Sequence, residues 1–272
     1  MSTYVIGDIQ GCYKEFKELL KQINFNKKND TLWLAGDLVN RGPKSYDVIK
    51  YIMDLDSSAI TVLGNHDFFL MASYYKLDPW PYKNNNFEDI LSSKDADQII
   101  NWLRSQKLIH LDSELGYILS HAGIYPEWNL NETISLAAQI ENALKGKKCK
   151  SFIKTLWSNE PNKWGRNLSK KEKLIFATNV FTRMRYLNKN LSLDFDEKTN
   201  PENLENNSLV PWYDFNNNIY ENYKVIIGHW STLGYRNKGN FISIDTGCSW
   251  GNKLTSIKIL KNKKVKKIEI KC

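Results

Sequence analysis

The 272-residue sequence lacks the features that mark membrane and secreted proteins. It has no apolar run long enough for a transmembrane span or a signal peptide. Its four cysteines, Cys12, Cys149, Cys248 and Cys272, form no short-spaced pair. We therefore expect a cytoplasmic protein with reduced thiols and no membrane association.

Histidine is also scarce, with four residues in the chain. Three of them, His66, His121 and His229, fall in small-residue or glycine-bounded loops that follow apolar runs. The fourth, His110, lies within an apolar, strand-like segment, and we interpret it as a core residue. One histidine alone is usually a hydrogen-bonded core residue, so the argument for a site depends on the three loop histidines together with their neighbours.

The composition permits one large core and a phosphate-rich ligand. Hydrophobic residues make up 42% of the chain, and α/β proteins of this length often form one domain, which we expect to span 1–272. The net charge of +8 favours encounter with phosphates but does not by itself indicate nucleic-acid binding.

Strand and helix patterns alternate along the first third of the chain. We expect strands at 3–6, 31–35 and 59–63, with amphipathic helices between them, and this order predicts a parallel sheet. Asp8, Asp37 and Asn65 each follow one of these strands, at spacings of 37 − 8 = 29 and 65 − 37 = 28 residues. A βαβ unit occupies roughly 30 residues, so the three side chains should meet at one sheet edge.

The remaining chain divides into a helical and a β-rich part. Segment 69–107 is mostly helical with breaks at 78–81 and 84–86, and strands at 109–111 and 117–119 lead to His121. From about 125 to 212 we expect a helical insertion that caps a cleft, with helices at 133–144 and 170–187. Further strands are expected at 225–227, 241–244, 254–260 and 265–270.

Carboxylate, amide and imidazole groups in one cleft indicate two divalent cations. Asp37, in the middle of the set, is the natural bridging ligand. Asp8 would serve one ion, while Asn65, His121 and His229 would serve the other. This mixed donor set suits Mn, Fe, Co or Zn better than calcium.

Other residues in these loops could bind or protonate a phosphate substrate. Arg41 follows the bridging aspartate and would aim its guanidinium at phosphate oxygens, and His66 could protonate a leaving oxygen. Arg183 and Arg185 lie two residues apart on an expected helix, so their side chains should point to different faces of it. One of them could contact substrate phosphate, and we favour Arg183. Tryptophans could stack on a base, although core packing is the commoner role; those considered are Trp157, Trp164, Trp212 and Trp230.

These loops together resemble those of the calcineurin-like metallophosphoesterases of the phosphoprotein-phosphatase branch. The matching segments are GDIQG at 7–11, GDLVNRG at 36–42 and GNHD at 64–67. With FTRMR at 181–185 and DTGCSWG at 245–251, they resemble those of the symmetrical bis(5'-nucleosyl)-tetraphosphatases over nearly the whole chain. The resemblance implies a four-layer αββα sandwich with a helical cap insertion.

The resemblance also implies roles for individual residues. The metal ligands would be Asp8, Asp37, Asn65, His121 and His229. Gln10 stands at the position of a further ligand, although its residue type differs from that of the family. Arg41 would contact phosphate and His66 would act as general acid, oriented by Asn40. Three residues depart from the branch pattern: Gln10 replaces histidine, Asn40 replaces aspartate and Asp67 replaces glutamate. Asn40 can accept a hydrogen bond from His66, and Asp67 could supply the charge that Asn40 lacks.

The activity implied by the resemblance is hydrolysis of diadenosine tetraphosphate to two ADP by a metal-bridged hydroxide. Mn or Co would support it, with Fe, Zn or Mg as alternatives. A serine/threonine protein phosphatase would share the same metal core, and removal of nucleoside-tetraphosphate caps from RNA 5' ends would use related chemistry. A basic binding module without activity is supported only by Gln10 and Asn40. No obligate protein partner is inferred.

Overall fold

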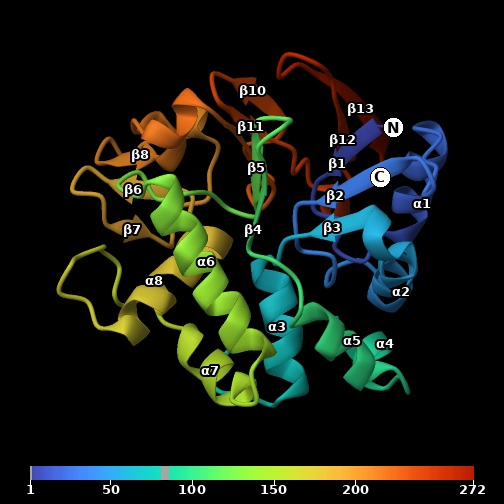
Figure 1. The fold of residues 1–272 in the computed structure, drawn as a ribbon, viewed down its shortest axis with the longest axis horizontal. Coiled ribbons are helices and arrows are strands. Elements are labelled where there is room, and N and C mark those ends of the chain that lie inside the picture. Colours follow the sequence, from blue (N-terminus) through green and yellow to red (C-terminus); the bar gives the residue numbers. More distant parts are fainter. Residues whose placement is uncertain (1, 81–85) are drawn as a thin grey trace.

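Two five-stranded sheets form the centre of the protein, in a computed structural model that describes residues 2–80 and 86–272 (Figure 1). The first sheet has the order β13-β12-β1-β2-β3, in which β1, β2 and β3 are parallel. The second has the order β10-β11-β9-β5-β4, in which β5, β9 and β11 are parallel. The strands of the first sheet are β1 (Ser2–Ile6), β2 (Asp30–Leu34), β3 (Ala59–Thr61), β12 (Lys253–Ile259) and β13 (Val265–Lys271). Those of the second are β4 (Ile109–Asp112), β5 (Tyr117–Ser120), β9 (Lys224–Ile227), β10 (Arg236–Lys238) and β11 (Phe241–Ser243).

Alternation of side chains along the strands produces the layers. In β1, Tyr4 and Ile6 belong to the large core that includes the helices, whereas Val5 belongs to a separate core between the two sheets. In β9, Val225 belongs to the large core and Ile226 to the core between the sheets. Successive strand residues point to opposite faces, so each sheet is covered by helices outside and by the other sheet inside. The predicted αββα sandwich is confirmed, as are the strand positions up to one or two residues.

Helices cover the outer faces of the sandwich (Figure 1). Next to the first sheet lie α1 (Tyr13–Gln22) and α2 (Ser45–Leu55), followed in the chain by α3 (Asn65–Tyr74), α4 (Glu88–Leu91) and α5 (Ala96–Leu103). The long helices α6 (Leu130–Lys145) and α8 (Lys170–Arg183) pack on each other with α7 (Cys149–Leu156). Short 3₁₀ turns are η1 (Asp56–Ser58), η2 (Pro201–Asn203), η3 (Trp212–Asp214), η4 (Asn218–Glu221) and η5 (Cys248–Trp250). The two predicted breaks in the helical segment, at 78–81 and 84–86, include residues 81–85, which lie outside the described part of the chain.

Segment 125–212 contains a small sheet as well as helices, which the sequence analysis did not predict. Strands β6 (Tyr186–Asn188), β7 (Leu193–Asp194) and β8 (Leu209–Pro211) form it in the order β7-β6-β8. The helix predicted over 170–187 ends at Arg183, because Met184 has an extended backbone with ψ of 134° and β6 follows. Apolar spacing alone does not separate a helix end from a short strand that pairs with distant residues.

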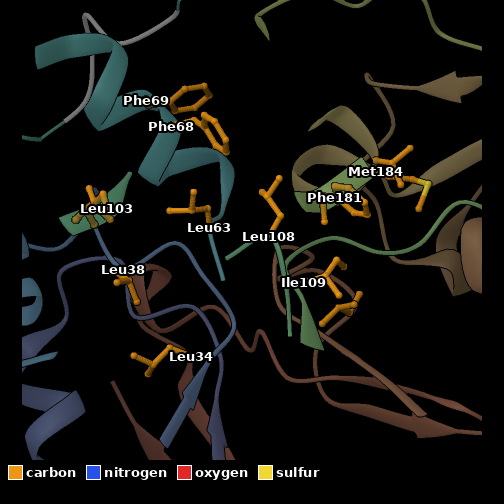
Figure 2. Close-up of a cluster of buried hydrophobic side chains, with 14 of the residues drawn as sticks. Leu34, Leu38, Leu63, Phe68, Phe69, Leu103, Leu108, Ile109, Phe181 and Met184 are labelled. Carbon is orange, nitrogen blue, oxygen red and sulfur yellow. The ribbon is translucent and has the colours of Figure 1, made fainter. Parts of the chain in front are cut away.

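A continuous apolar cluster joins the site-bearing loops to this segment. Leu38, Leu63 and Phe68 lie beneath the ends of β2 and β3, and Phe181 and Met184 approach from the end of α8 (Figure 2). All five side chains are at most 1% exposed. A close-packed interior leaves little room for movement. The loops are therefore held in place by packing on both sides.

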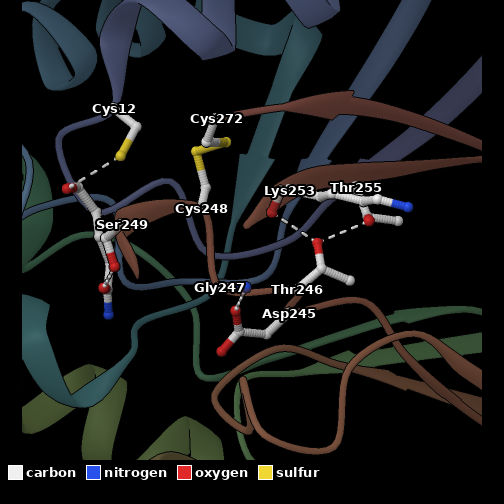
Figure 3. The surroundings of a disulfide bond; sticks show 10 residues. Cys12, Asp245, Thr246, Gly247, Cys248, Ser249, Lys253, Thr255 and Cys272 are labelled. Atoms are coloured by element: carbon white, nitrogen blue, oxygen red, sulfur yellow. Dashed lines mark hydrogen bonds between the residues drawn. A yellow bond between two sulfur atoms is a disulfide. The ribbon is translucent and has the colours of Figure 1, made fainter. Parts of the chain in front are cut away.

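The structure pairs Cys248 and Cys272 in a disulfide, so the prediction of four reduced thiols is wrong for these two (Figure 3). The antiparallel hairpin of β12 and β13 brings Cys272 back beside the start of β12, where its N–H donates to the Asn252 carbonyl at 2.9 Å. The two cysteines lie 24 residues apart in sequence, so only the hairpin register places them together. Cys12 and Cys149 are free and buried, as expected.

Among the described residues, no helix combines the length and apolar character needed to cross a membrane. This agrees with the absence of a long apolar run in the sequence.

His110 should make folding stability depend on pH. Its ring lies 4.5 Å from the Trp33 ring, centroid to centroid, and burial next to Lys107 lowers the pKa of His110 to about 4. In the unfolded chain the pKa of this histidine is near 6.5. The contribution of neutral His110 to folding stability is therefore fully present above pH 6.5 and is lost as the pH falls toward 4. The free energy of unfolding is measured with urea at pH 7 and at pH 5. We expect it to fall by about 2 kcal/mol less in His110→Gln than in the wild type. Equal losses in both proteins would contradict this origin.

Candidate metal centre

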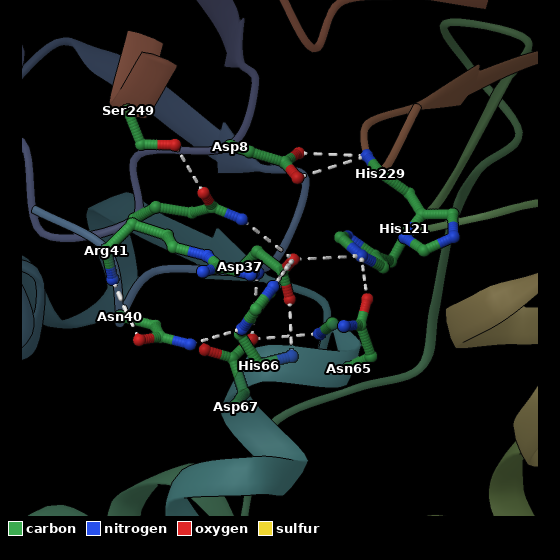
Figure 4. A network of polar contacts seen from close by, with 12 residues as sticks. Asp8, Asp37, Asn40, Arg41, Asn65, His66, Asp67, His121, His229 and Ser249 are labelled. Atoms are coloured by element: carbon green, nitrogen blue, oxygen red, sulfur yellow. Dashed lines mark hydrogen bonds and ion pairs between the residues drawn. The ribbon is translucent and has the colours of Figure 1, made fainter. Parts of the chain in front are cut away.

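The predicted ligands converge on one edge of the sandwich (Figure 4). Asp8, Asp37 and Asn65 follow β1, β2 and β3 of the first sheet, and His121 and His229 follow β5 and β9 of the second. Both strand sets are parallel, so their carboxyl ends lie at one edge, where open α/β sheets build sites. The side chains that the sequence analysis grouped therefore meet between the two sheets.

Asp37 lies in the middle of the group. Its Oδ1 accepts a hydrogen bond from the His66 backbone N–H at 2.8 Å. Its Oδ2 lies 3.5 Å from His121 Nε2 and 3.8 Å from His66 Nε2. Gly64 makes this position possible, because a Cβ there would lie 2.1 Å from Asp37 Oδ1. The middle position matches the predicted role of a shared ligand.

The hydrogen bonds of His121 fix which of its nitrogens is free. Nδ1 lies 2.7 Å from the Ala35 carbonyl oxygen, which can only accept, so Nδ1 carries the proton. Nε2 of the neutral ring then has a lone pair, and it faces Asn65 Oδ1 at 3.3 Å and Asp37 Oδ2 at 3.5 Å. Three acceptor atoms facing one another without a hydrogen between them favour a cation in their midst.

His229 adds a second free nitrogen to this group. Its Nε2 is buried and has no hydrogen-bond partner within the described residues. One ligand atom each from Asp37, His121 and His229 lie within 4.8 Å of one another. A buried polar atom without a partner is costly, and a metal ion satisfies it. The residues present therefore fit a divalent ion.

Asp8 is held next to His229 by the backbone. The N–H of His229 donates to both carboxylate oxygens of Asp8 at 3.1 Å. Gly228 permits this approach, because a Cβ there would lie 2.0 Å from Asp8 Oδ1. Burial, followed by the nearby Asp245 and Asp37 carboxylates, raises the pKa of Asp8 well above its usual value. Crowded carboxylates of this kind gain from a bound cation.

Backbone strain also concentrates at this edge. Five of the predicted site residues have positive φ without being glycine: Gln10 (45°), Asp37 (47°), Asn40 (84°), Arg41 (56°) and His229 (64°). Residues in this region of φ cost free energy and persist where surrounding contacts impose them, commonly at functional sites.

Asp245 is a buried acid of the site to which the sequence analysis gave no role. It follows β11, lines the cleft beside Asp8, and burial raises its pKa to about 6. The same signal that identified Asp8, a polar residue directly after a predicted strand, was present in the segment 241–244 and could have identified it.

Asp67 contacts the backbone of the β2 loop. Its carboxylate accepts hydrogen bonds from the N–H groups of Gly64 and Asp37 through Oδ2, at 2.8 and 2.9 Å, and from that of Leu38 through Oδ1, at 3.1 Å. It is fully buried and joins the start of α3 to the loop that carries Asp37. The side chain thus holds the two ligand loops together.

Gln10 contacts the Asp37 carboxylate through its amide nitrogen. Nε2 donates to Asp37 Oδ2 at 3.3 Å, and Oε1 accepts from Ser249 Oγ at 2.6 Å. In this arrangement the amide nitrogen faces Asp37 and the amide oxygen faces Ser249. Metal ligation by Gln10 beside Asp37 would require the amide group to turn.

Asn40 contacts the His66 ring with its nitrogen. Asn40 Oδ1 accepts from the N–H groups of Arg41 and Asn86, at 2.8 and 3.0 Å. Its Nδ2, 2.6 Å from His66 Nδ1, therefore donates and the ring nitrogen accepts, the reverse of the expected direction. Burial lowers the pKa of His66, so the ring is neutral with its proton on Nε2.

A cleft of about 630 Å³, here called the site cleft, opens over these residues. Arg41, Arg183 and Arg185 all line it, so the expectation that the last two point to different faces is wrong. The reason is that α8 ends at Arg183 and Arg185 lies in the extended chain beyond it. Arg185 is half-buried, and its Nη2 donates to the His229 carbonyl at 3.1 Å. Burial lowers the pKa of Arg185 to about 10, against attraction from Asp245, Asp37 and Asp8.

Of the tryptophans considered for base stacking, Trp157 is half-buried and lines the site cleft. Trp230 also lines it but is only 1% exposed, and Trp212 is fully buried. Trp164 packs edge-to-face on Trp128. Trp250, which was not considered, lines the cleft and is exposed.

Comparisons with known proteins agree with this geometry. A model of the calcineurin-like phosphoesterases matches residues 1–266. The chain is 46% identical over 256 residues to the "Bis(5'-nucleosyl)-tetraphosphatase, symmetrical" of Buchnera aphidicola subsp. Schizaphis graminum (strain Sg), covering 94% of this chain and 93% of that one. It is 41% identical to the protein of the same name from Proteus mirabilis (strain HI4320), over 95% of this chain and 94% of the relative.

A solved structure is similar along the whole chain. The crystal structure of "a putative diadenosine tetraphosphatase" superimposes with a TM-score of 0.65 at 21% identity. The alignment covers 98% of this chain and 93% of the other. At this identity the likeness shows the fold.

Proposed function

The chain belongs to the calcineurin-like phosphoesterase family, and from this premise we propose that it hydrolyses diadenosine tetraphosphate symmetrically to two ADP. The metal-fitting group of Asp37, His121 and His229 is the observation that carries the hydrolytic chemistry. The names of relatives at 41–46% identity, aligned over almost their whole length, support the choice of substrate.

The donor atoms support two divalent ions, of which Mn or Co are our choice. Asp37 would contribute to both ions, Asp8 to one, and Asn65, His121 and His229 to the other. Carboxylate, amide and neutral imidazole donors together suit these metals, with Fe, Zn or Mg as alternatives. When bound, divalent ions supply an activated water and balance charge on phosphate oxygens.

The three arginines surround the space where a polyphosphate would lie. The positive charge of Arg185 is attracted by the buried carboxylates of Asp245, Asp37 and Asp8. Arg41 is exposed on the opposite lip, with its guanidinium available to phosphate oxygens. Arg183 is held by hydrogen bonds to Asn179 Oδ1 and Asn159 Oδ1, at 2.9 and 2.8 Å. We therefore propose Arg41 and Arg185 as the main phosphate contacts and Arg183 as a rigid wall.

His66 is placed to assist the leaving group. Its Nε2–H lies on the side of Asp37, whereas Nδ1 is held by Asn40. The leaving oxygen of ADP is a terminal phosphate oxygen, whose pKa near 6 makes it a stable anion at neutral pH. A hydrogen bond from His66 Nε2 is then sufficient to stabilise its departure, and Asn40 keeps the ring in the orientation that offers it.

Segment 125–212 would determine which phosphate compound is accepted. We propose one domain over 1–272 in which this segment is an insertion that covers the centre. Five of its residues line the site cleft beside the predicted ligands from both sheets: Trp157, Arg183, Arg185, Phe195 and Lys198. The metal core is shared by phosphatases of different substrates, so this wall is where selectivity would lie.

Product identification tests the proposed function. The protein, with manganese or cobalt added, is incubated with diadenosine tetraphosphate and the nucleotides are separated by chromatography. We expect ADP alone, in a ratio of two per substrate consumed. AMP with ATP would show cleavage at another phosphate and contradict symmetrical hydrolysis.

The alternative substrates are tested in the same assay. We expect the specificity constant for diadenosine tetraphosphate to exceed that for a phosphoserine peptide. A faster reaction with the peptide would favour the protein-phosphatase alternative. Cap removal from RNA would show a steep dependence on salt, because RNA binding releases counterions, whereas the dinucleotide reaction would not.

A further inference from the structure

Trp250 stands apart from the other tryptophans of the protein. Its side chain is 62% exposed, whereas Trp33, Trp80, Trp128, Trp212 and Trp230 are at most 5% exposed. A large aromatic ring left in water forgoes the free energy of burial, so its exposure at a cleft suggests a ligand that covers it.

The short turn η5 holds the ring in this exposed position. Within the turn, the N–H of Trp250 donates to the Gly247 carbonyl at 3.0 Å, and that of Gly251 donates to the Cys248 carbonyl at 2.9 Å. The disulfide to Cys272 fastens the turn to the β12–β13 hairpin (Figure 3). Ser249, the neighbouring residue, is hydrogen-bonded to Gln10 (Figure 4). The backbone that carries the ring is therefore fixed, and only the side chain of Trp250 has to be ordered when a ligand binds.

The neighbour of Trp250 in the site cleft is a phosphate-binding candidate. The Arg41 guanidinium carbon lies 5.2 Å from the centre of the Trp250 ring. The cation lies over one face of the ring, and the 62% exposure of the Trp250 side chain leaves the rest of the ring in water. One lip of the cleft thus offers an open aromatic surface beside a cation. A nucleotide presents the matching pair, a flat base and a charged phosphate chain.

The aromatic faces on the opposite wall are already occupied. The Arg183 guanidinium carbon lies 4.2 Å from the centre of the Trp157 ring and 4.3 Å from that of Phe195. The arginine is thus sandwiched between these rings and held by its two hydrogen bonds to asparagines. A base would have to displace this half-buried, hydrogen-bonded cation to stack there, so of the two walls the one with Trp250 is open to a base.

From these contacts we infer that Trp250 is the stacking platform for one adenine of the substrate, with Arg41 holding the phosphates that follow it. This inference rests on the proposed function for the identity of the nucleotide. It assigns base recognition to one side of the centre only, so the second adenine of a symmetrical dinucleotide contributes less to binding. A residue that stacks a base usually changes nucleotide affinity by about fivefold to a hundredfold when it is replaced by alanine.

Binding of ADP and of pyrophosphate tests this role without requiring turnover. The dissociation constants of both are measured by calorimetry in the presence of manganese, for the wild type, Trp250→Ala and Trp250→Phe. We expect Trp250→Ala to weaken ADP binding at least tenfold more than pyrophosphate binding, and Trp250→Phe to restore most of the difference. Trp102→Ala serves as a matched control, because Trp102 is a half-buried tryptophan on α5 that is not part of the cleft.

Two results would overturn the inference. Equal weakening of ADP and pyrophosphate would mean that Trp250 acts by positioning Arg41, and unchanged ADP binding would mean that no base meets the ring. Failure of the proposed function gives a different pattern, in which diadenosine tetraphosphate is not cleaved but the tryptophan still distinguishes ADP from pyrophosphate.

Discussion

Replacement of Asp37 by asparagine is expected to remove both bound metal and activity. Asp37 lies between ligands from the two sheets, and its Oδ2 is within 3.5 Å of His121 Nε2. The amide is nearly the same size but has lost the charge that both ions would share. We expect the metal content after dialysis to fall below one ion per chain and kcat/KM on diadenosine tetraphosphate to fall on the order of 10⁴-fold or more.

A matched control separates this effect from misfolding. Asp54→Asn makes the same chemical change at an exposed position on α2 and should keep metal and activity. The Asp37→Asn protein should itself remain folded, because it lies among other buried carboxylates and the change relieves their repulsion. Wild-type turnover by a folded Asp37→Asn protein would refute the bridging assignment.

Replacement of His66 by asparagine is expected to slow turnover while metal stays bound. His66 Nε2 lies 3.8 Å from Asp37 Oδ2, and Nδ1 is held by Asn40 at 2.6 Å. The ring thus borders the centre, and we propose that it faces the leaving group. We expect kcat to fall by about 10²- to 10⁴-fold, measured with saturating metal, and the metal content to equal that of the wild type. If metal is lost in parallel with activity, His66 is a ligand.

Asn40→Asp is the companion to this experiment. A carboxylate in place of the amide would accept a hydrogen bond from His66 Nδ1, where Asn40 now donates. The added negative charge favours the protonated ring and raises the pKa of His66. In the variant the neutral ring would carry its proton on Nδ1, so Nε2–H would exist only while the ring is protonated, whereas the neutral wild-type ring keeps Nε2–H. We expect kcat/KM of the variant to fall as the pH rises above the pKa of His66, a fall that the wild type lacks, with the metal content unchanged. An unmoved profile would show that the protonation of His66 does not govern the rate.

The convergence of the predicted ligands could be foreseen from sequence because their positions follow from strand order. Parallel strands joined by helices place their carboxyl ends together, so Asp8, Asp37 and Asn65 were grouped from spacing alone. His121 and His229 come from a different sheet, and only their small-residue loops marked them. The packing of one sheet on the other, which brings the two groups together, entered through the family resemblance.

Other features depend on contacts that a sequence pattern does not contain. The end of α8 at Arg183 depends on the pairing of β6 with β7 and β8, and it reverses the expectation for Arg185. The orientation of Asn40 is decided by the backbone amides of Arg41 and Asn86, one adjacent and one 46 residues away. The Cys248–Cys272 pair depends on the register of a hairpin. In each case a partner distant in sequence determines the outcome.

The hydrogen bond from His229 to Asp8 spans 221 positions of the chain, and this separation bears on biosynthesis. A ribosome adding roughly 5–20 residues per second completes Asp8 roughly 10 to 40 seconds before His229. During that interval the nascent polypeptide holds acidic side chains that lack their imidazole counterparts. Uptake of the proposed ions would therefore be completed late in the maturation of this protein, since Asp8 and His229, two of the predicted ligands, are translated 221 residues apart.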